Sequence, residues 1–173
     1  MTDQNKRELK PGQFNLQWIP IDWPLTPLGK NKDPYVKGWQ NQPFSVRDIE
    51  QELTTGECKA VGLLGGPVYN HPYGLVWVDI DGPTVYKAIE DLCGNSIEEA
   101  LPKTLTICSG KEGRERKLYK LKREQHKHFI RNKYTWHAEA PKEKLEILWK
   151  KHQGVLMGLH PDTQGYYTAK DQG

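Results

Sequence analysis

Asp79 and Asp81 close the only strongly apolar stretch of the chain, residues 74–82. Side chains two residues apart on a strand point to the same face, so a strand here would carry both carboxylates on one face near its end. Two anions this close repel each other unless one is protonated or a divalent cation lies between them. Because carboxylate oxygens are hard ligands, the pair predicts a site for Mg²⁺ or Mn²⁺ rather than zinc.

Glu146 is a candidate for a third carboxylate at the same site. It lies in an apolar segment, residues 145–149, where strand alternation sets it on the face opposite Leu145, Ile147 and Trp149. If this strand lies beside the first, the three carboxylates converge. Three acids can hold two metal ions about 3.5–4 Å apart, the arrangement used for in-line displacement at phosphorus.

Two polar turns carry groups that suit a phosphate. Residues 109–114 combine a hydroxyl, two glycines and two cations in Ser109, Lys111 and Arg114. Glycines let backbone N–H groups approach phosphate oxygens, and the cations neutralise their charge. The turn at residues 160–167 begins with His160, which could contact a triphosphate or a base. A plain hairpin loop and a capped surface turn are the alternatives for these two segments.

Positive charge is concentrated in residues 110–137. This segment holds ten Lys or Arg and three Glu, a local charge of +7, whereas the whole chain carries +3, which leaves −4 for the remainder. Such a concentration predicts a surface for a polyanion, with a solvated face as the equal alternative.

The elements that must position these groups are read from periodicity and capping residues. Residues 1–44 show no sustained helical period and are expected to form loops and short strands. One helix should begin at Ser45 and end at Gly56, and a second should follow Pro83, with Val85, Ile89 and Leu92 on one face, and end at Gly94. Besides 74–82, strands are expected at 59–64, 104–109, 117–121, 145–149 and 155–159. The pattern predicts an α+β fold with a mainly antiparallel sheet.

Length and composition indicate one domain. A chain of 173 residues buries enough surface for a core. Cys58, Cys93 and Cys108 are odd in number and lack Cys-x-x-Cys spacing, so we expect buried thiols in a reducing compartment. No apolar run approaches the roughly 18 residues of a membrane span. We therefore expect a cytoplasmic protein with no membrane partner.

An Asp-x-Asp pair by itself is compatible with several other interpretations. Glycosyltransferases contain it, and residues 79–82 followed by Thr84 resemble the first motif of haloacid-dehalogenase-type phosphatases. Pro83 interrupts that phosphatase motif, and no later Asp-Asp pair completes its metal site. A structural alternative makes Asp81 the N-cap of the helix after Pro83 and Asp79 a solvent-facing strand end.

Taken in order, these pieces resemble the bifunctional primase–polymerase (prim-pol) domain of the archaeo-eukaryotic primase superfamily. The matching segments cover nearly the whole chain, and their order and spacing carry the resemblance more than any one motif. They are residues 23–25 with 37–39, 74–82, 109–114, 146–148 and 160–167.

The resemblance implies an RRM-like catalytic subdomain packed against an N-terminal α/β part. It also implies template-directed, metal-dependent nucleotidyl transfer for primer synthesis and extension, with DNA template and primer and dNTP or NTP as partners. Asp79, Asp81 and Glu146 would bind two Mg²⁺ or Mn²⁺ ions, and the turn at 109–114 would hold the triphosphate. Such domains usually form one end of a longer replication protein with a helicase, so we expect this chain to be a fragment of one.

One motif departs from the family pattern. Many members place a phosphate-binding histidine shortly after the Ser-Gly turn, where this chain has Arg116 and Lys117, and we expect one of these cations to replace it. The candidates for contact with the template or primer backbone are Lys120, Lys122, Arg123, Lys127 and Lys133. A non-catalytic nucleic-acid-binding replication-initiator module is the second hypothesis, and a phosphatase is the third.

Overall fold

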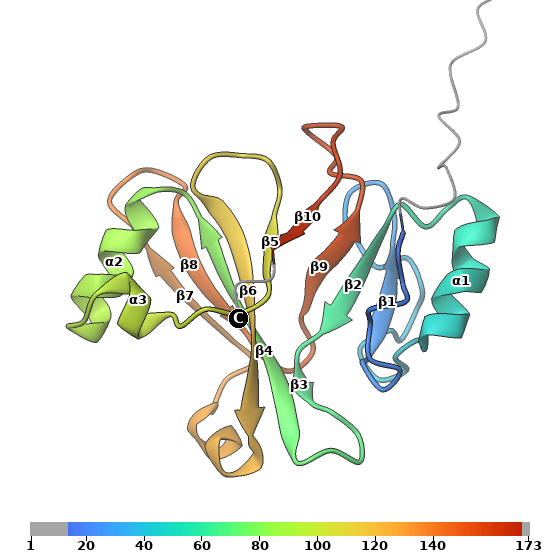
Figure 1. Cartoon of the computed structure of the whole chain (residues 1–173), viewed down its shortest axis with the longest axis horizontal. Helices are drawn as coiled ribbons and strands as arrows, with labels where there is room; N and C mark the ends of the chain where they lie inside the picture. Colours follow the sequence, from blue (N-terminus) through green and yellow to red (C-terminus); the bar gives the residue numbers. More distant parts are fainter. Residues whose placement is uncertain (1–13, 171–173) are drawn as a thin grey trace, which may run out of the picture.

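The computed structural model describes residues 14–170 and contains two facing sheets (Figure 1). The smaller sheet has the order β1 (Leu25–Leu28), β2 (Ala60–Leu64), β9 (Gln153–Gly158). The larger sheet has the order β10-β5-β6-β4-β8-β7, and β3 (Gly66–Pro67) pairs with β4. The bounds of its other strands are β4 (Tyr73–Asp81), β5 (Thr106–Cys108), β6 (Arg114–Lys122), β7 (Lys133–His137), β8 (Lys144–Leu148) and β10 (Thr168–Lys170).

The helices cover the outer faces of the two sheets. α1 (Val46–Thr55) lies against the smaller sheet, whereas α2 (Thr84–Cys93) and α3 (Ile97–Ala100) cover the larger one (Figure 1). A 3₁₀ segment, η1 (Arg123–His128), follows β6 at the lower end of the molecule. Every named strand pair is antiparallel, so the predicted α+β class with mainly antiparallel sheets is confirmed.

Large apolar side chains between the two sheets form the main core. Trp77 of β4 is fully buried there, and its indole N–H donates to the Leu63 carbonyl of β2 at 2.8 Å. Leu75 and Trp77 share this core with residues of both sheets. Because side chains alternate along a strand, the same face of β4 continues from these two residues to Asp79 and Asp81. The core therefore fixes the face on which the carboxylates lie.

Most predicted elements are confirmed. Ser45 caps α1 through its side chain, and Gly56 ends the helix in the left-handed region. The strands carrying Asp79 and Glu146 form as expected. Three predictions were wrong in detail: Cys93 is exposed and Cys108 is half-buried, although both were expected to be buried, and β6 begins at Arg114 rather than at residue 117. Leu92, at the end of the predicted apolar face of α2, is 53% exposed.

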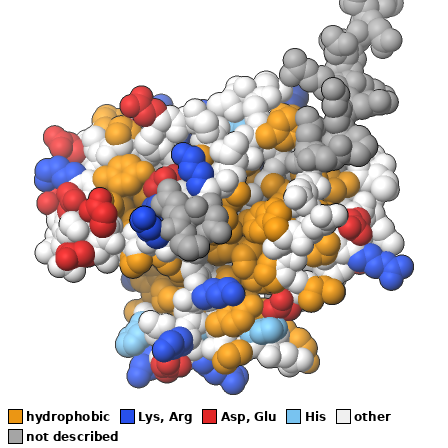
Figure 2. Space-filling view, viewed as in Figure 1, with side chains coloured by type: hydrophobic (Ala, Val, Ile, Leu, Met, Phe, Trp, Pro, Cys, Tyr) orange, Lys and Arg blue, Asp and Glu red, His pale blue; other side chains and the backbone are white. Residues whose placement is uncertain are grey.

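Charged side chains are unevenly distributed over the visible surface. In the view of Figure 2, His and Lys or Arg side chains gather at the lower end, where Figure 1 shows η1 and the connection between β3 and β4. Acidic side chains are more frequent on the left, over α2 and α3. No helix within residues 14–170 has the length and apolar character needed to cross a membrane.

Candidate functional site

Strand pairing brings the three predicted carboxylates together on adjacent strands. Asp79 of β4 lies directly opposite Glu146 of β8, and on its other side it lies opposite Arg116 of β6. Asp81 is paired with Arg114 of β6 in the same register. Cβ atoms of directly opposed residues lie about 4.5–5.5 Å apart. The sheet thus gathers three acids and two arginines at one end of β4.

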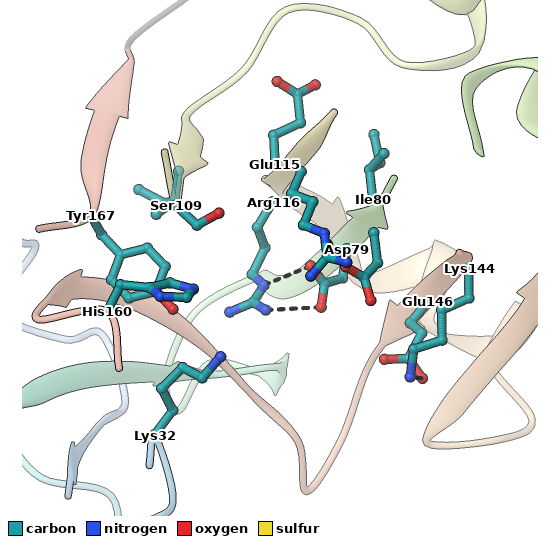
Figure 3. A pocket seen from close by; sticks show the side chains of 13 residues that line it. Lys32, Asp79, Ile80, Ser109, Glu115, Arg116, Lys144, Glu146, His160 and Tyr167 are labelled. Atoms are coloured by element: carbon teal, nitrogen blue, oxygen red, sulfur yellow. Dashed lines mark hydrogen bonds and ion pairs between the residues drawn. The ribbon is translucent and has the colours of Figure 1, made fainter. Parts of the chain in front are cut away.

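Asp79 is held by a two-point contact with Arg116 (Figure 3). The Arg116 Nη2 lies 2.8 Å from Asp79 Oδ2, and its Nε donates to Oδ1 at 3.0 Å. Burial disfavours the guanidinium charge, but the attraction of Asp79 outweighs it and raises the pKa of Arg116. Bidentate arginine–carboxylate pairs are among the stronger hydrogen-bonded contacts in proteins. Arg116 therefore neutralises the carboxylate that was expected to bind metal.

Asp81 and Glu146 also have basic partners. Arg114 Nε lies 3.1 Å from Asp81 Oδ1. Glu146 Oε1 lies 2.6 Å from the Lys133 ammonium and 3.1 Å from that of Lys144. Burial acts to raise the pKa of Glu146, but hydrogen bonds from these two lysines outweigh burial and lower it. All three carboxylates therefore have cations of this chain as ion-pair partners.

The donor set fits a divalent metal by chemistry and by strand position. Three carboxylates on adjacent strands offer hard oxygen ligands on one face, as Mg²⁺ and Mn²⁺ require. The side chains are nevertheless turned toward their basic partners, and no group of three or more His, Cys, Asp or Glu within residues 14–170 is arranged to hold a metal ion. A metal could be bound here only if Arg116 and the other cations moved off the carboxylates.

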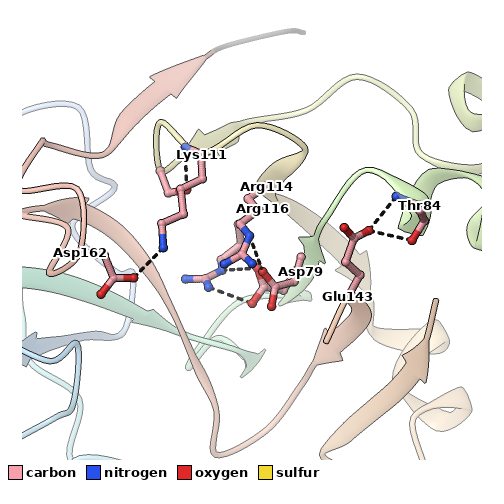
Figure 4. Close-up of polar contacts among 9 residues, drawn as sticks. Asp79, Thr84, Lys111, Arg114, Arg116, Glu143 and Asp162 are labelled. Atoms are coloured by element: carbon pink, nitrogen blue, oxygen red, sulfur yellow. Dashed lines mark hydrogen bonds and ion pairs between the residues drawn. The ribbon is translucent and has the colours of Figure 1, made fainter. Parts of the chain in front are cut away.

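The turn after β5 is held at this end of β4 by a close backbone contact. Gly113 has a φ of +64°, and a Cβ at this position would lie 2.6 Å from the Pro83 nitrogen. The Gly82 N–H donates to the Gly113 carbonyl at 3.0 Å. Only glycine combines this backbone conformation with so close an approach. Ser109 lines the same pocket as the carboxylates, and Lys111 pairs with Asp162 at 2.6 Å (Figure 4).

His160 and two residues absent from the predicted site complete the pocket. His160 is 4% exposed, and burial followed by repulsion from Lys32 lowers its pKa. Its Nδ1 accepts hydrogen bonds from the backbone N–H groups of Asp162 and Thr163 at 3.2 and 3.3 Å, so the imidazole is neutral at that nitrogen. Tyr167 stacks obliquely on the ring, and Lys32 extends into the pocket from the loop after β1 (Figure 3).

Lys32 could not have been identified from local sequence. It lies far along the chain from the other pocket residues and reaches them only because the two sheets face each other. Burial, together with repulsion by Arg116, lowers the pKa of its ammonium group. The pocket itself measures about 230 Å³. This is below the usual range for ligand sites.

Lys117 lies on the opposite face of the sheet from the carboxylates. Because β6 pairs Arg116 with Asp79 and Arg114 with Asp81, alternation sends residues 114 and 116 toward the carboxylates and residues 115 and 117 away from them. The Lys117 ammonium lies 3.0 Å from Glu115 and donates to Thr106 at 3.3 Å, in a buried position. Of the two cations expected to replace the histidine, only Arg116 is brought to the site.

The helix after Pro83 is not capped by Asp81. The Thr84 N–H and hydroxyl both donate to Glu143 Oε2, at 2.8 and 2.7 Å (Figure 4). A carboxylate from the loop before β8 therefore accepts the hydrogen bond of the free backbone N–H in the first turn of α2, which an N-cap side chain would otherwise do. Asp81 contacts Arg114 instead, which removes the structural alternative considered for it.

The predicted nucleic-acid contacts fall into two groups. Lys120 and Lys122 of β6 are exposed toward the far end of the strand from the carboxylates, and Arg123 and Lys127 are exposed on η1. Lys133 is different, because β7 places it beside Glu146. It belongs to the ion-pair cluster rather than to the lower end of the molecule.

The family model described as "Bifunctional DNA primase/polymerase, N-terminal" matches residues 16–172. No curated protein and no solved structure matches the chain. The match gives no support to the phosphatase hypothesis, and it confirms the resemblance drawn from the sequence. The chain therefore belongs to the bifunctional DNA primase/polymerase (prim-pol) family.

Proposed function

We propose that this domain is a DNA primase/polymerase that joins dNTP or NTP to a growing strand on a DNA template. The observation that carries the proposal is the register of β4, which sets Asp79 opposite Glu146 and both aspartates on one face. A polar pocket with cations from three separate segments surrounds them. Family membership supports nucleotidyl transfer, and the residue roles below are our assignment.

Asp79, Asp81 and Glu146 are assigned as the ligands of two Mg²⁺ or Mn²⁺ ions. Bound there, these ions would lower the pKa of a 3′-hydroxyl and offset the charge that develops as pyrophosphate leaves. The low pKa of Glu146 supports this role, since a ligand carboxylate must be ionised. The strand ends hold the three side chains on one rigid sheet, so little reorganisation of the backbone is needed.

Arg114 and Arg116 are assigned to the triphosphate. In the closed arrangement they neutralise Asp81 and Asp79. A triphosphate offers the same kind of anionic oxygen in larger number, so the guanidinium groups can exchange a carboxylate for a phosphate without losing a charge-assisted contact. This exchange would free the carboxylates when the nucleotide arrives. In this chain, Arg116 takes the part of the phosphate-binding histidine.

Ser109, Lys111, His160 and Lys32 are assigned to the far side of the nucleotide. All but Lys111 line the pocket directly, and Lys111 pairs with Asp162 beside it. A neutral imidazole and a hydroxyl can orient phosphate or sugar oxygens by hydrogen bonds. Lys117 is left out of the proposed site because its ammonium pairs with Glu115 on the other face.

A primer-synthesis and extension assay with labelled nucleotides tests the assignment. The purified chain, given a single-stranded DNA template and Mg²⁺ or Mn²⁺, should form or extend primers. An Asp79→Asn, Asp81→Asn variant should lose this activity, while Asp91→Asn on the exposed face of α2 should retain it. Full activity of the double variant would show that the assigned carboxylates are not catalytic.

A non-catalytic nucleic-acid-binding module is the second candidate. The observation that favours it is that all three carboxylates are closed by ion pairs, with Arg116 in contact with Asp79. Such a module would bind DNA and show no Mn²⁺-dependent binding of nucleotide. Equilibrium binding of a labelled dNTP with and without Mn²⁺ separates the two candidates, because the polymerase requires the metal to strengthen that binding.

A further inference from the structure

The lower end of the molecule contains a second pocket, away from the carboxylates. We define the basal pocket as the cavity between the connection of β3 to β4 and the start of η1, about 670 Å³ in volume. The Arg123 N–H donates to the Pro72 carbonyl at 3.0 Å and fixes the two connections side by side (Figure 1). The basal pocket is lined by Pro67, Val68, Tyr69, Asn70, His71, Pro72, Arg123 and His126.

Tyr69 is the most unusual side chain of this pocket. It is 87% exposed, although aromatic side chains gain free energy by burying their large apolar surface. Asn70 follows it with a φ of +61°, so a tight turn presents the ring at the tip of the β3–β4 connection. An exposed ring on a turn that is anchored on both sides is a platform on which a flat, apolar group can stack.

The cations around the basal pocket are not neutralised. Within residues 14–170, Lys122, Arg123 and Lys127 form no ion pair with an acidic side chain, and all three are exposed. The nearby Asp22 is already engaged by His71 at 2.7 Å and by the Tyr73 hydroxyl at 3.0 Å. Of the three cations, only Arg123 lines the basal pocket, while Lys122 and Lys127 flank the lining residues Arg123 and His126 along the chain. Glu124 is also exposed and offsets one charge, so three cations and one carboxylate (3 − 1) leave +2 for a ligand or counterions to balance.

The unpaired cations and the exposed Tyr69 ring together indicate which class of ligand the basal pocket binds. Free cations suit a polyanion, and an exposed aromatic ring suits the face of an unpaired base. In a duplex the base faces are stacked on one another and are inaccessible to a side chain, so the ring adds nothing to duplex binding. A lipid or an acidic peptide would use the cations but would gain little from a ring on a turn.

We propose that the basal pocket binds single-stranded nucleic acid, with Tyr69 stacked on an unpaired base and Lys122, Arg123 and Lys127 on phosphates. The inference rests on the proposed function only in naming this strand as the template. Asp79 lies six positions along β4 from Tyr73, about 20 Å at the usual rise of a strand. That span corresponds to roughly six stacked nucleotides. The pocket would anchor the template at a distance from the nucleotide that is being joined.

Fluorescence anisotropy with a labelled 12-nucleotide oligo(dT), in EDTA and without nucleotide, tests the proposal. Tyr69→Ser should weaken binding roughly 10-fold, whereas Tyr69→Phe, which keeps the ring, should bind as the unmodified chain does. Leu92→Ser, an exposed apolar position on α2, is the matched control and should have no effect. Thermal unfolding of each variant checks that the fold is retained.

Salt dependence tests the phosphate contacts separately. Arg123→Gln with Lys127→Gln should lower the slope of log affinity against log salt by about 1.4, because each lost contact with a single strand removes about 0.7. Lys87→Gln on α2 should leave the slope unchanged. The proposal is overturned if Tyr69→Ser binds oligo(dT) normally, or if a duplex of the same length binds as tightly as the single strand. Neither result bears on catalysis, since no metal or nucleotide is present.

Discussion

The two ends of the β4–β6 pair differ in how they treat positive charge. At the carboxylate end, Arg114 and Arg116 are each bound to an aspartate. At the basal end of the same two strands, Lys122 and Arg123 face solvent without an acidic partner among the described residues. A cation that is paired within the protein can bind another anion only after it leaves its carboxylate. An unpaired cation attracts an anion directly. One pair of strands thus carries ion-paired arginines at one end and leads to unpaired, exposed cations at the other.

The largest effect that separates the two ends is expected from Glu146→Gln. The change keeps the shape of the side chain but removes a negative charge opposite Asp79. We expect nucleotidyl transfer to fall about 100-fold or more, in the range found when one electrostatic contact to a transition state is lost. Primer extension at saturating nucleotide is the measurement, with Glu139→Gln in the exposed loop after β7 as control. An undiminished rate would exclude Glu146 from the catalytic group.

The second largest effect is expected from Arg116→Gln, which tests whether Arg116 moves from Asp79 to a phosphate when the nucleotide binds. In Arg116→Gln, Asp79 loses the guanidinium 2.8 Å from its oxygen, so Mn²⁺ no longer competes with an internal cation. We expect Mn²⁺ affinity without nucleotide to rise several-fold and triphosphate affinity to fall about 10-fold, the value of one charge-assisted contact. Isothermal titration of each ligand measures both. A fall in both affinities would contradict the exchange.

Lys32→Ala should have a smaller effect at the carboxylate end. This lysine enters the pocket from the loop after β1, and burial, together with repulsion by Arg116, lowers the pKa of its ammonium group. An incoming triphosphate would relieve that repulsion, so we expect the KM for nucleotide to rise about 3- to 10-fold with little change in kcat. Lys30→Ala, in the same loop, is the matched control. An unchanged KM would remove Lys32 from the nucleotide site.

The smallest effect is a pH dependence that arises at His160. Its folded-state pKa lies below the ordinary value of 6.5, so the unfolded chain binds the proton more readily. The contribution of neutral His160 to the free energy of unfolding should therefore be fully present above pH 6.5 and should be lost as the pH falls through the folded-state pKa. A change of about 1 kcal/mol lowers the Tm of a domain of this size by roughly 2–4 °C. His160→Gln should show a weaker fall in Tm between pH 7.5 and 5.5, and an identical fall would assign the effect elsewhere.

Prediction from sequence worked best where a residue's role depends on its neighbours in the chain. Ser45 and Gly56 signalled both ends of α1, and the apolar run before Asp79 signalled β4 because a buried central strand needs such a run. Glu146 was found by the same alternation. These features follow from local capping and periodicity.

What the sequence did not reveal depends on pairing between distant segments. β7 was missed because residues 133–137 alternate with exposed polar side chains at an edge of the sheet, inside the basic segment. The side of the sheet taken by Arg116 and Lys117 depends on the register of β6 against β4, which pairs Arg116 with Asp79, and a shift of this register by one residue would exchange the two faces. Lys32 reaches the pocket only through the packing of two sheets.

The role of the three carboxylates is tested most directly by anomalous diffraction from crystals grown with Mn²⁺ and a non-hydrolysable dNTP. We expect anomalous density between Asp79, Asp81 and Glu146, with Arg114 and Arg116 moved from the carboxylates to the phosphates. Density for Mn²⁺ elsewhere, with the Arg116–Asp79 pair still closed, would contradict it.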